Sequence, residues 1–436
     1  MFKRKIDAVL DAWKNDKDKL PLVIKGPRQI GKTTSILAFG KRNYEHVVYI
    51  NFDESHELNF IFDGNLDVDT IIINMTAAIP GVELVPNESL IILDEIQSCP
   101  NARTALKFFA IDGRFDVIAS GSLLGINYKE VRSYPVGYEM VEEMHSFDFE
   151  EFLWALGYDD NIKNILKNFF DKEMKVPEAI HKKMMENFKN YIIVGGMPKV
   201  VDIFVNTKDL TKVYQMQKAI VQSYENDIAK YAEMKDKTKA RACFLSIPKQ
   251  LSKENKKFQY SKVAHGARAR EYEGSLMWLY DSGIVNYCHN LSCLQLPLEG
   301  NAIDQVFKIY MRDTGLFMSM LEPGSQADIL KGNLGIYKGA IYENIIADIL
   351  TKMGRKLYYY KKGDDTTELD FVIRYQGACV PIEVKSTNGN AKAMKHAISA
   401  KENDVTYGIK LIDGNIGRSQ NILTIPLYMA FLLTDY

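Results

Sequence analysis

The sequence has few cysteines, almost no net charge and no long apolar run, and each shortage excludes a class of protein. Its five cysteines are odd in number and lack a paired metal-ligand spacing, so we expect free thiols rather than a disulfide framework. No stretch approaches the roughly 20 apolar residues that a membrane-spanning helix needs. The basic N-terminus is not followed by the apolar segment of a signal peptide. We therefore expect a cytoplasmic protein with no membrane partner.

The net charge is −1, because 55 basic residues nearly balance 56 acidic ones. A chain with so little net charge has no global attraction to nucleic acid, so any basic binding surface must be local. Hydrophobic residues make up 46% of the chain and charged residues 25%, which are the proportions of a globular protein. A length of 436 residues exceeds one ordinary hydrophobic core and indicates about three domains.

The most specific pattern lies at residues 26–33, where GPRQIGKT fits G-x-x-x-x-G-K-S/T. An apolar run at 20–24 precedes it and predicts a buried strand, and residues 33–39 predict a helix. In that context, loop amides and the helix N-terminus bind phosphate oxygens. Lys32 is expected to reach the β- and γ-phosphates, and the Thr33 hydroxyl to ligate Mg²⁺. The predicted residues of this nucleoside triphosphate site are Gly26, Pro27, Arg28, Gln29, Ile30, Gly31, Lys32, Thr33, Thr34 and Ser122.

Two acidic residues, Asp94 and Glu95, end an apolar strand predicted at 89–93. Behind a phosphate-binding loop, such a pair is the second signature of an ATPase. We expect Asp94 to hold Mg²⁺ through its water shell and Glu95 to polarise the attacking water, so Glu95 and Lys32 are the predicted catalytic residues. The strand predicted at 115–119 leads to Ser120 and Ser122, where either hydroxyl could sense the γ-phosphate; a polar turn is the alternative. Strands alternating with helices predict a parallel sheet that binds nucleotide at the carboxyl ends of its strands.

Several later segments carry a family resemblance. They are residues 99–102 (CPNA), 106–109 (LKFF), 119–125 (ASGSLLG), 133–137 (SYPVG) and 146–153 (SFDFEEFL). Together they resemble the prokaryotic AAA-superfamily ATPases related to origin-recognition and STAND ATPases. Those proteins usually carry Arg or Lys after the glycine at 137, where this sequence has Tyr138. Arg132 lies nearby and could take the place of that basic residue in acting on phosphate. The alternative is that Arg132 is an ordinary surface arginine.

The sequence GGMP at residues 195–198 also resembles a joint of that family, within a helical lid or linker predicted over 154–236. The two glycines are expected to act either as a hinge or as a simple helix stop.

Basic residues concentrate between positions 235 and 270. They are Lys235, Lys237, Lys239, Arg241, Lys249, Lys253, Lys256, Lys257, Lys262, Arg268 and Arg270, against Asp236 and Glu254. Three short helices are predicted here before a strand near 283–287, which is the outline of a winged helix-turn-helix. We expect this domain over 237–298, with residues 268–272 starting the recognition helix and the lysines binding DNA phosphates. A basic face on a protein-binding winged helix is the alternative.

The last predicted module, residues 299–436, combines acidic residues on a helix and on two strands. Glu343 lies near the start of the helix, Asp370 on one strand, and Glu383 and Lys385 on one face of the next strand. This D…E-x-K arrangement resembles the restriction-endonuclease-like fold, which follows the ATPase in the family named above. The resemblance implies Asp370, Glu383 and Lys385 as catalytic residues, and Glu343, Asp370 and Glu383 as Mg²⁺ ligands. An inactive or merely recognising module is the alternative.

We therefore predict an α/β protein of four domains. These are an AAA-type P-loop NTPase core with a parallel sheet (1–153), a helical lid or linker (154–236), a winged-helix domain (237–298) and an α/β restriction-endonuclease-like domain (299–436). The predicted cofactors are ATP and Mg²⁺ and the predicted partner is DNA, while protein partners and the oligomeric state are left open. The predicted function couples ATP binding and hydrolysis to a DNA-associated module with metal-dependent nuclease activity. The alternative is a STAND-like, ATP-driven switch that binds proteins and has an inactive C-terminal domain.

Overall fold

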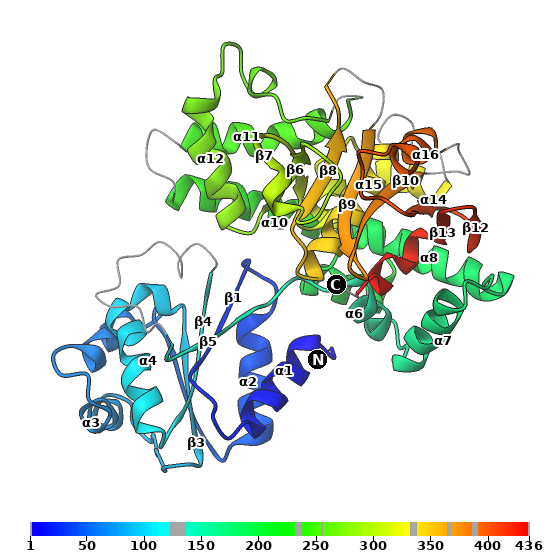
Figure 1. Cartoon of the computed structure of the whole chain (residues 1–436). Coiled ribbons are helices and arrows are strands. Elements are labelled where there is room, and N and C mark those ends of the chain that lie inside the picture. The colour runs from blue at the N-terminus through cyan, green and yellow to red at the C-terminus, as the bar shows by residue number, and fades with distance from the viewer. Residues whose placement is uncertain are drawn as a thin grey trace. The chain divides into compact units, whose positions relative to one another are not determined.

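The computed structural model describes residues 2–122, 137–231, 237–253, 256–331, 338–363, 368–385 and 391–434. The chain divides into two compact units, Met1–Ser146 with Asp281–Gly283, and Phe147–Tyr280 with Ile284–Tyr436 (Figure 1). Arg132 and, from the basic segment, Lys235, Asp236 and Glu254 lie outside the described residues. All five cysteines are free thiols. Within the described ranges, no helix is both long and apolar enough to cross a membrane.

The first unit is built on a five-stranded sheet in the order β2-β3-β4-β1-β5. Its strands are β1 (Leu22–Gly26), β2 (His46–Asn51), β3 (Ser89–Asp94), β4 (Asp116–Ser122) and β5 (Met140–Glu143). Every pairing is parallel, as the alternation of strands and helices predicted. All residues of β3 are buried, as expected for a parallel strand that is covered on both faces.

Helices cover this sheet, with α3 and α4 on one side and α1 and α2 on the other (Figure 1). The helices are α1 (Lys5–Asn15), α2 (Lys32–Asn43), η1 (His56–Phe62), α3 (Val68–Ala78), η2 (Ile96–Ser98) and α4 (Pro100–Asp112). Ile71 of α3 and Leu106 of α4 pack in one core with Ile91 of β3. This packing fixes the carboxyl ends of β1, β3 and β4 in neighbouring positions.

The second unit begins with helices. They are α6 (Phe149–Ala155), α7 (Asp160–Asp171), α8 (Glu178–Val194), α9 (Pro198–Thr207), α10 (Leu210–Tyr231), α11 (Lys237–Leu251), η3 (Tyr260–Lys262) and α12 (Ala269–Asp281). A capping box starts α6, since the Asp148 carboxylate accepts from the Glu151 amide and the Glu151 carboxylate accepts from the Asp148 amide. The rings of Phe149 and Phe188 then meet edge to face at 5.1 Å, which joins α6 to α8.

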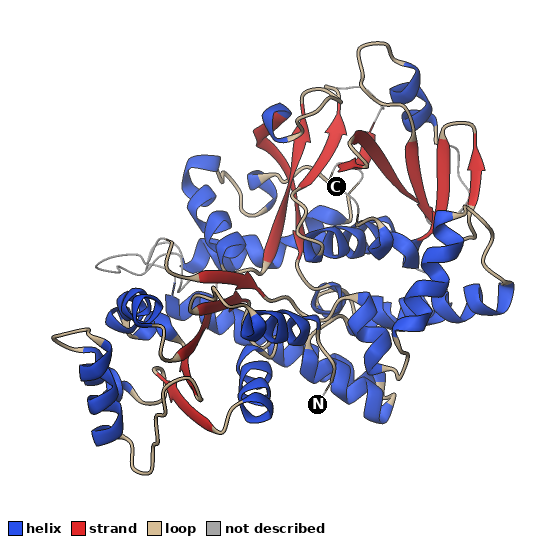
Figure 2. Ribbon diagram, turned by 60° about the horizontal axis from the view of Figure 1, so that its bottom comes forward, coloured by secondary structure: helices blue, strands red, loops and turns tan. Residues whose placement is uncertain are grey.

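An eight-stranded mixed sheet completes this unit, in the order β12-β13-β11-β10-β9-β8-β6-β7 (Figure 2). Its strands are β6 (Val285–Leu291), β7 (Ala302–Met311), β8 (Leu357–Lys361), β9 (Glu368–Tyr375), β10 (Ala378–Lys385), β11 (Gly408–Ile412), β12 (Gly417–Ser419) and β13 (Ile422–Pro426). The accompanying helices are η4 (Glu299–Asn301), α13 (Thr314–Ser319), α14 (Ser325–Lys331), α15 (Lys338–Lys352), α16 (Lys392–Ser399) and η6 (Leu427–Leu432).

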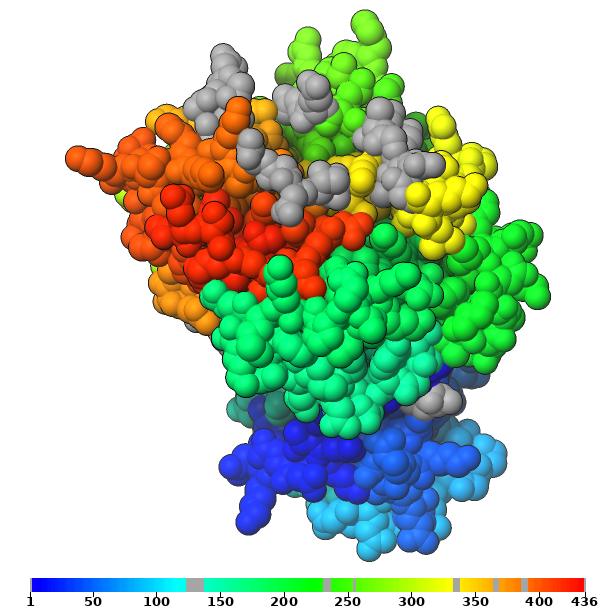
Figure 3. Space-filling view, turned by 90° about the vertical axis from the view of Figure 1, so that its right-hand side faces the viewer, coloured from blue at the N-terminus to red at the C-terminus, as the bar shows by residue number. Residues whose placement is uncertain are grey.

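The C-terminal residues, red in Figure 3, lie against the green helical segment that opens the same unit. His181 of α8 lies 3.0 Å from the Tyr428 hydroxyl, and the Val176 amide donates to the Asn415 side chain at 2.9 Å. Residues of the predicted helical lid or linker therefore contact the C-terminal residues of the same unit.

The strand expected to complete a winged helix near 283–287 is β6, and it belongs to the large sheet. It pairs antiparallel with β7 and parallel with β8, and the Tyr287 ring packs on Phe307 of β7 at 4.8 Å. The predicted boundary at 298/299 therefore falls between two paired strands. The helical elements α11, η3 and α12 follow in the predicted order, and the antiparallel pair of β6 and β7 comes after them. The winged-helix domain stays a prediction.

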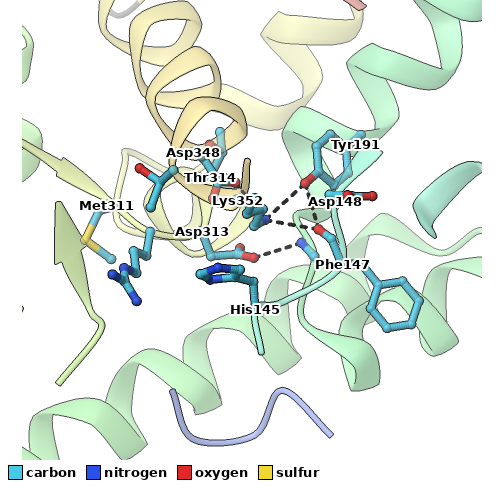
Figure 4. Close-up of polar contacts among 12 residues, drawn as sticks. His145, Phe147, Asp148, Tyr191, Met311, Asp313, Thr314, Asp348 and Lys352 are labelled. Atoms are coloured by element: carbon cyan, nitrogen blue, oxygen red, sulfur yellow. Dashed lines mark hydrogen bonds and ion pairs between the residues drawn. The ribbon is translucent and has the colours of Figure 1, made fainter. Parts of the chain in front are cut away.

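A buried polar network lies where the second unit begins (Figure 4). The Lys352 ammonium donates to the Phe147 carbonyl oxygen (3.0 Å), the Tyr191 hydroxyl oxygen (3.1 Å) and the Asp348 carboxylate (2.9 Å). The Tyr191 hydroxyl donates to the same carbonyl at 2.7 Å. These bonds attach Phe147 to both α8 and α15.

Gly195 and Gly196 follow the end of α8 and lie beside this network. Their backbone packs so closely against its neighbours that no side chain fits at either position. A Cβ on Gly196 would collide with the Phe147 carbonyl, and a Cβ on Gly195 with the Asp313 carboxylate. The Gly196 amide donates to Asp313 Oδ2 at 2.8 Å, and Gly195 has a left-handed φ of 72°. The GGMP segment is therefore a closely packed stop between α8 and α9.

Candidate functional site

The predicted phosphate loop joins β1 to α2. Gly26 is the last residue of β1 and Lys32 the first of α2, and Gly31 at the helix N-cap has a left-handed φ of 92°. A Cβ on Gly26 would collide with the Met144 carbonyl, so only glycine fits there. Ile30 is buried, Arg28 is partly buried, and Gln29 and Thr34 are exposed. The loop thus has the strand, turn and helix setting of a phosphate-binding loop.

Lys32 is buried under this loop. Its ammonium donates to the carbonyl oxygens of Gly26 (3.0 Å) and Pro27 (2.8 Å). Burial lowers the pKa of Lys32 to about 8, although the nearby Glu95 and Asp94 carboxylates act in the opposite direction. A cation held by neutral carbonyls in a low-dielectric setting gains strongly from a nearby anion.

Asp94, at the end of β3, is the centre of the hydrogen bonding beside the loop. Its Oδ2 accepts from the Thr33 hydroxyl (2.7 Å) and the Tyr49 hydroxyl (3.0 Å). Its Oδ1 accepts from the Ser120 hydroxyl and from the Glu95 amide. Helix α2, strands β2 and β4 and the residue after β3 therefore all contribute to orienting one carboxylate.

Glu95 follows Asp94 in a left-handed conformation, with φ 51° and ψ 44°. The Gln97 amide donates to its carboxylate, and burial raises the pKa of Glu95. A positioned carboxylate with a raised pKa is suited to accept a proton from water. Ser122 stands opposite Gly26 in the β1–β4 register, whereas Ser120 is the serine that contacts Asp94.

Sequence reasoning missed Tyr49 and Gln97. Tyr49 is two residues before the end of β2, the strand next to β3. An aromatic residue in an apolar strand gives no local sign of a role, and only the sheet order places its hydroxyl at Asp94. The structure does bring together the residues that the sequence predicted here, namely those of the loop, Thr33 and Asp94.

This donor set fits ATP and Mg²⁺. A hydroxyl and a carboxylate 2.7 Å apart, Thr33 and Asp94, are oxygen ligands of the kind that Mg²⁺ prefers. The glycine-dependent turn at Gly26 and the first turn of α2 present backbone amides where phosphate oxygens would lie.

A second cluster lies on the C-terminal sheet, around Glu343 of α15. One Glu343 oxygen accepts from the Tyr310 hydroxyl at 2.9 Å and lies 3.6 Å from the Lys308 ammonium. The other oxygen pairs with the Lys256 ammonium. Although burial alone would raise it, these lysines keep the pKa of Glu343 below its usual value. Both oxygens of the predicted helical ligand are therefore engaged by cations or donors.

Asp370 and Glu383 are less fully engaged. Asp370 Oδ2 accepts from the Val384 amide at 2.8 Å, and burial together with the Glu343 carboxylate raises the pKa of Asp370 to about 7. Glu383 Oε1 lies 2.9 Å from the Lys385 ammonium. Its Oε2 is buried and has no hydrogen-bond partner among the described residues. A buried carboxylate oxygen without a partner is costly, and a cation would satisfy it.

Lys308 and one further lysine, Lys361, neutralise the remaining acid of the cluster. Glu368 lies 2.7 Å from the buried Lys308 ammonium and 3.0 Å from that of Lys361. The Lys308 ammonium also lies 4.6 Å from the centre of the Tyr359 ring. Four carboxylates and four lysines thus meet, contributed by β7, β8, β9, β10, α15 and the segment between α11 and η3.

The three predicted metal ligands of this sheet do not form a compact set. Within the described part of the chain, only Glu45, His46 and Glu88 bring three potential ligand atoms within 4.8 Å of one another. That group lies on the first unit and is largely exposed. Asp370 and Glu383 fit a metal ion through their incompletely engaged oxygens, whereas Glu343 does not.

The described part of the basic segment exposes many of its cations. The exposed ones are Arg241, Lys249, Lys253, Lys257, Lys262, Arg268 and Arg270. Arg241 pairs with Glu225 at 2.7 Å, and Lys239 lies over the Tyr272 ring at 5.6 Å. Arg268 and Arg270 flank the start of α12, where the recognition helix was expected.

Three family models match separate parts of the chain. An AAA domain matches residues 18–153. One domain of unknown function (DUF8612) matches residues 185–327, and another (DUF4143) matches residues 338–429. No curated protein matches the chain. Residues 18–153 therefore form a P-loop ATPase domain of the AAA type, as the sequence predicted.

Solved structures similar to the chain have low sequence identity to it. The Walker-type ATPase PABY2304 of Pyrococcus abyssi is 12% identical, with a TM-score of 0.42, over 73% of this chain and 96% of that one. The ORC1 protein of Aeropyrum pernix in complex with DNA is 12% identical, with a TM-score of 0.29, over 76% and 92%. AMPPCP-bound DnaA from Aquifex aeolicus is 12% identical, with a TM-score of 0.28, over 63% and 86%. The assignment of the ATPase domain rests on the family model.

Proposed function

We propose that this protein binds ATP with Mg²⁺ at residues 26–33, hydrolyses it, and couples its nucleotide state to a DNA-associated C-terminal module. The observation that carries the proposal is the 2.7 Å contact between the Thr33 hydroxyl and the Asp94 carboxylate, directly beside the loop. Thr33 and Asp94 would hold Mg²⁺. When bound, the ion would neutralise charge on the phosphates.

The roles of the other residues follow from their surroundings. Lys32 is a buried cation that would bind the β- and γ-phosphates. Glu95 is positioned by Gln97 and would orient the attacking water and accept its proton. Ser120 and Tyr49 act as positioning residues, because both donate to Asp94.

The test of this proposal is nucleotide binding and turnover by two variants. Lys32→Ala should lose ATP binding, because it removes the cation under the phosphates. Glu95→Gln should still bind ATP but hydrolyse it about 100-fold more slowly or worse, the usual effect of losing a general base. Hydrolysis by Lys32→Ala at the original rate would overturn the ATPase assignment.

DNA is the proposed partner of the basic segment. Support comes from the exposed cations between Arg241 and Arg270, in a chain whose net charge is −1. Binding of duplex DNA should weaken steeply with rising salt, since phosphate contacts release counterions. No affinity at low salt would favour a protein-binding switch instead.

Two candidate functions remain for the acidic cluster of the C-terminal sheet. The D…E-x-K set of Asp370, Glu383 and Lys385 supports metal-dependent cleavage of nucleic acid, with Asp370 and Glu383 as ligands. The lysines on Glu343 support the second candidate, a STAND-like switch whose C-terminal domain does not cleave. Incubating plasmid with Mg²⁺ or Mn²⁺ separates them. Cleavage by wild type but not by Asp370→Ala supports the nuclease, and no cleavage by either supports the switch.

A further inference from the structure

We propose that Lys256 is a built-in cation that competes with a divalent metal ion at the acidic cluster of the C-terminal sheet. Lys256 belongs neither to the sheet nor to α15. It lies between α11 and η3, and its ammonium pairs with Glu343, 87 positions further along the chain. The inference rests on the proposed metal binding by Asp370 and Glu383.

The surroundings of the Lys256 ammonium disfavour a positive charge at this position. Both side chains are largely buried, with 16% of Lys256 and 4% of Glu343 exposed, so the ammonium has lost most of its hydration. A Cβ on Gly339 would lie only 3.4 Å from the nitrogen. The ammonium therefore lies beside the first turn of α15, where the helix dipole disfavours a positive charge. The Glu343 carboxylate is what holds it there.

Lys308 is also buried near Glu343, but it differs from Lys256 in its place in the fold and in its further partners. It projects from a strand of the sheet itself, is only 1% exposed, and pairs with Glu368 at 2.7 Å as well as lying near Glu343. Its contact with the Tyr359 ring adds a further attraction. Lys308 is thus an integral part of the sheet, whereas Lys256 is a cation supplied by another segment.

Lys256 and a metal ion would add positive charge to the same acidic cluster, Lys256 at Glu343 and the ion at Asp370 and Glu383. Glu343, the partner of Lys256, also lies 3.6 Å from the Lys308 ammonium, and Lys308 pairs with Glu368, two residues before Asp370 on β9. Adding a dication to a cluster already balanced by four lysines is less favourable than adding it to one with a net negative charge. Removing the Lys256 charge should therefore strengthen metal binding.

The experiment is calorimetric titration of the full chain with Mn²⁺ in a buffer without ATP. Circular dichroism checks that each variant is folded. Lys256→Gln should bind Mn²⁺ about tenfold more tightly than wild type, as expected for one unscreened charge in a partly buried site. Lys256→Arg, which keeps the charge, should bind like wild type. Lys257→Gln is the matched control, because it removes one lysine charge from the adjacent position, and should also bind like wild type.

A double variant tests whether the effect passes through Glu343. Lys256→Gln combined with Glu343→Gln removes both charges of the pair, so its Mn²⁺ affinity should return to within about threefold of wild type. Asp370→Asn should abolish this binding in every background, which separates the site from a surface ion at Glu45, His46 and Glu88.

The outcomes distinguish the proposed metal binding from the proposed competition by Lys256. If wild type and folded Lys256→Gln bind Mn²⁺ equally, and Asp370→Asn abolishes both, metal binding stands and the competing role of Lys256 is wrong. If neither protein binds Mn²⁺ through Asp370, both the proposed metal site and this inference are wrong. If Lys257→Gln tightens binding as much as Lys256→Gln, the effect is general surface charge and the inference is again wrong.

Discussion

Four hydrogen bonds converge on the Asp94 carboxylate, and this single side chain determines how the nucleotide site is organised. Its donors come from α2, β2 and β4 and from the next residue along the chain. A carboxylate held in this way has little freedom to rotate, so an ion bound beside it would meet its ligand in a fixed orientation. Tyr49 is the donor that no motif predicts.

Tyr49→Phe should lower kcat for ATP hydrolysis by about tenfold and leave KM nearly unchanged, because one hydrogen bond to a charged group is worth about 1.5–3 kcal/mol. The hydroxyl orients Asp94 and does not touch the nucleotide. Tyr44→Phe is the matched control, since the Tyr44 hydroxyl donates to Asp116 at the opposite end of the sheet. Equal kcat in wild type and Tyr49→Phe would show that Asp94 needs no such support.

The lowered pKa of Lys32 predicts that ATP binding depends on pH. In the free protein this pKa is about 8, and the phosphates of bound ATP would raise it. Above pH 8, binding must therefore take up a proton, and affinity should fall by up to about tenfold per pH unit. Below pH 8 the lysine is already charged and affinity should not depend on it.

Calorimetry at pH 7 and pH 9, in buffers of different ionisation enthalpy, measures this proton uptake directly. Lys32→Arg keeps its charge at both values and should show no uptake. Equal affinity at both pH values, with no dependence on buffer, would contradict the assignment of Lys32.

At the scale of elements, local patterns predicted the ATPase sheet well. The apolar runs at β1, β3 and β4 and the loop at 26–33 carry their own signals, because parallel central strands are buried on both faces. The same reasoning predicted a strand near 283–287, where β6 lies, but not that β6 pairs with β8 as well as with β7 in the large sheet. A short apolar strand does not encode which edge it will join, so a wing and a sheet strand look alike in sequence.

The turn between α8 and α9 gives a test of element packing. Gly196→Ala should destabilise the protein by about 1–3 kcal/mol, the usual cost of forcing extra volume into a packed region, because the new Cβ meets the Phe147 carbonyl. Gly274→Ala in α12 is the control, since a Cβ there meets nothing within 4 Å. It should be neutral or stabilising by about 0.5–1 kcal/mol. Thermal unfolding of the two variants checks this, and equal stability would mean that the turn is free to open.

At the scale of the whole molecule, the structure divides into two compact units, and the finer division into four domains stays a prediction. Contacts such as that of His181 with Tyr428 join the first helices of the second unit to its last residues. Contacts across more than 200 residues leave no periodic signal in a single sequence. The acidic residues at 370 and 383 were identifiable from their motif, whereas Lys256 and Lys308 were not, since their roles depend on where the sheet and α15 place Glu343.

We propose that ATP turnover at residues 26–33 is coupled to nucleic acid bound by the second unit. The most direct test of this coupling is the ATP hydrolysis rate of wild type and Glu95→Gln, each with and without duplex DNA at low salt. We predict that DNA changes the wild-type rate several-fold, that raising the salt concentration removes the change, and that Glu95→Gln stays inactive throughout. A wild-type rate that is the same with and without DNA, under conditions where DNA is bound, would contradict the coupling.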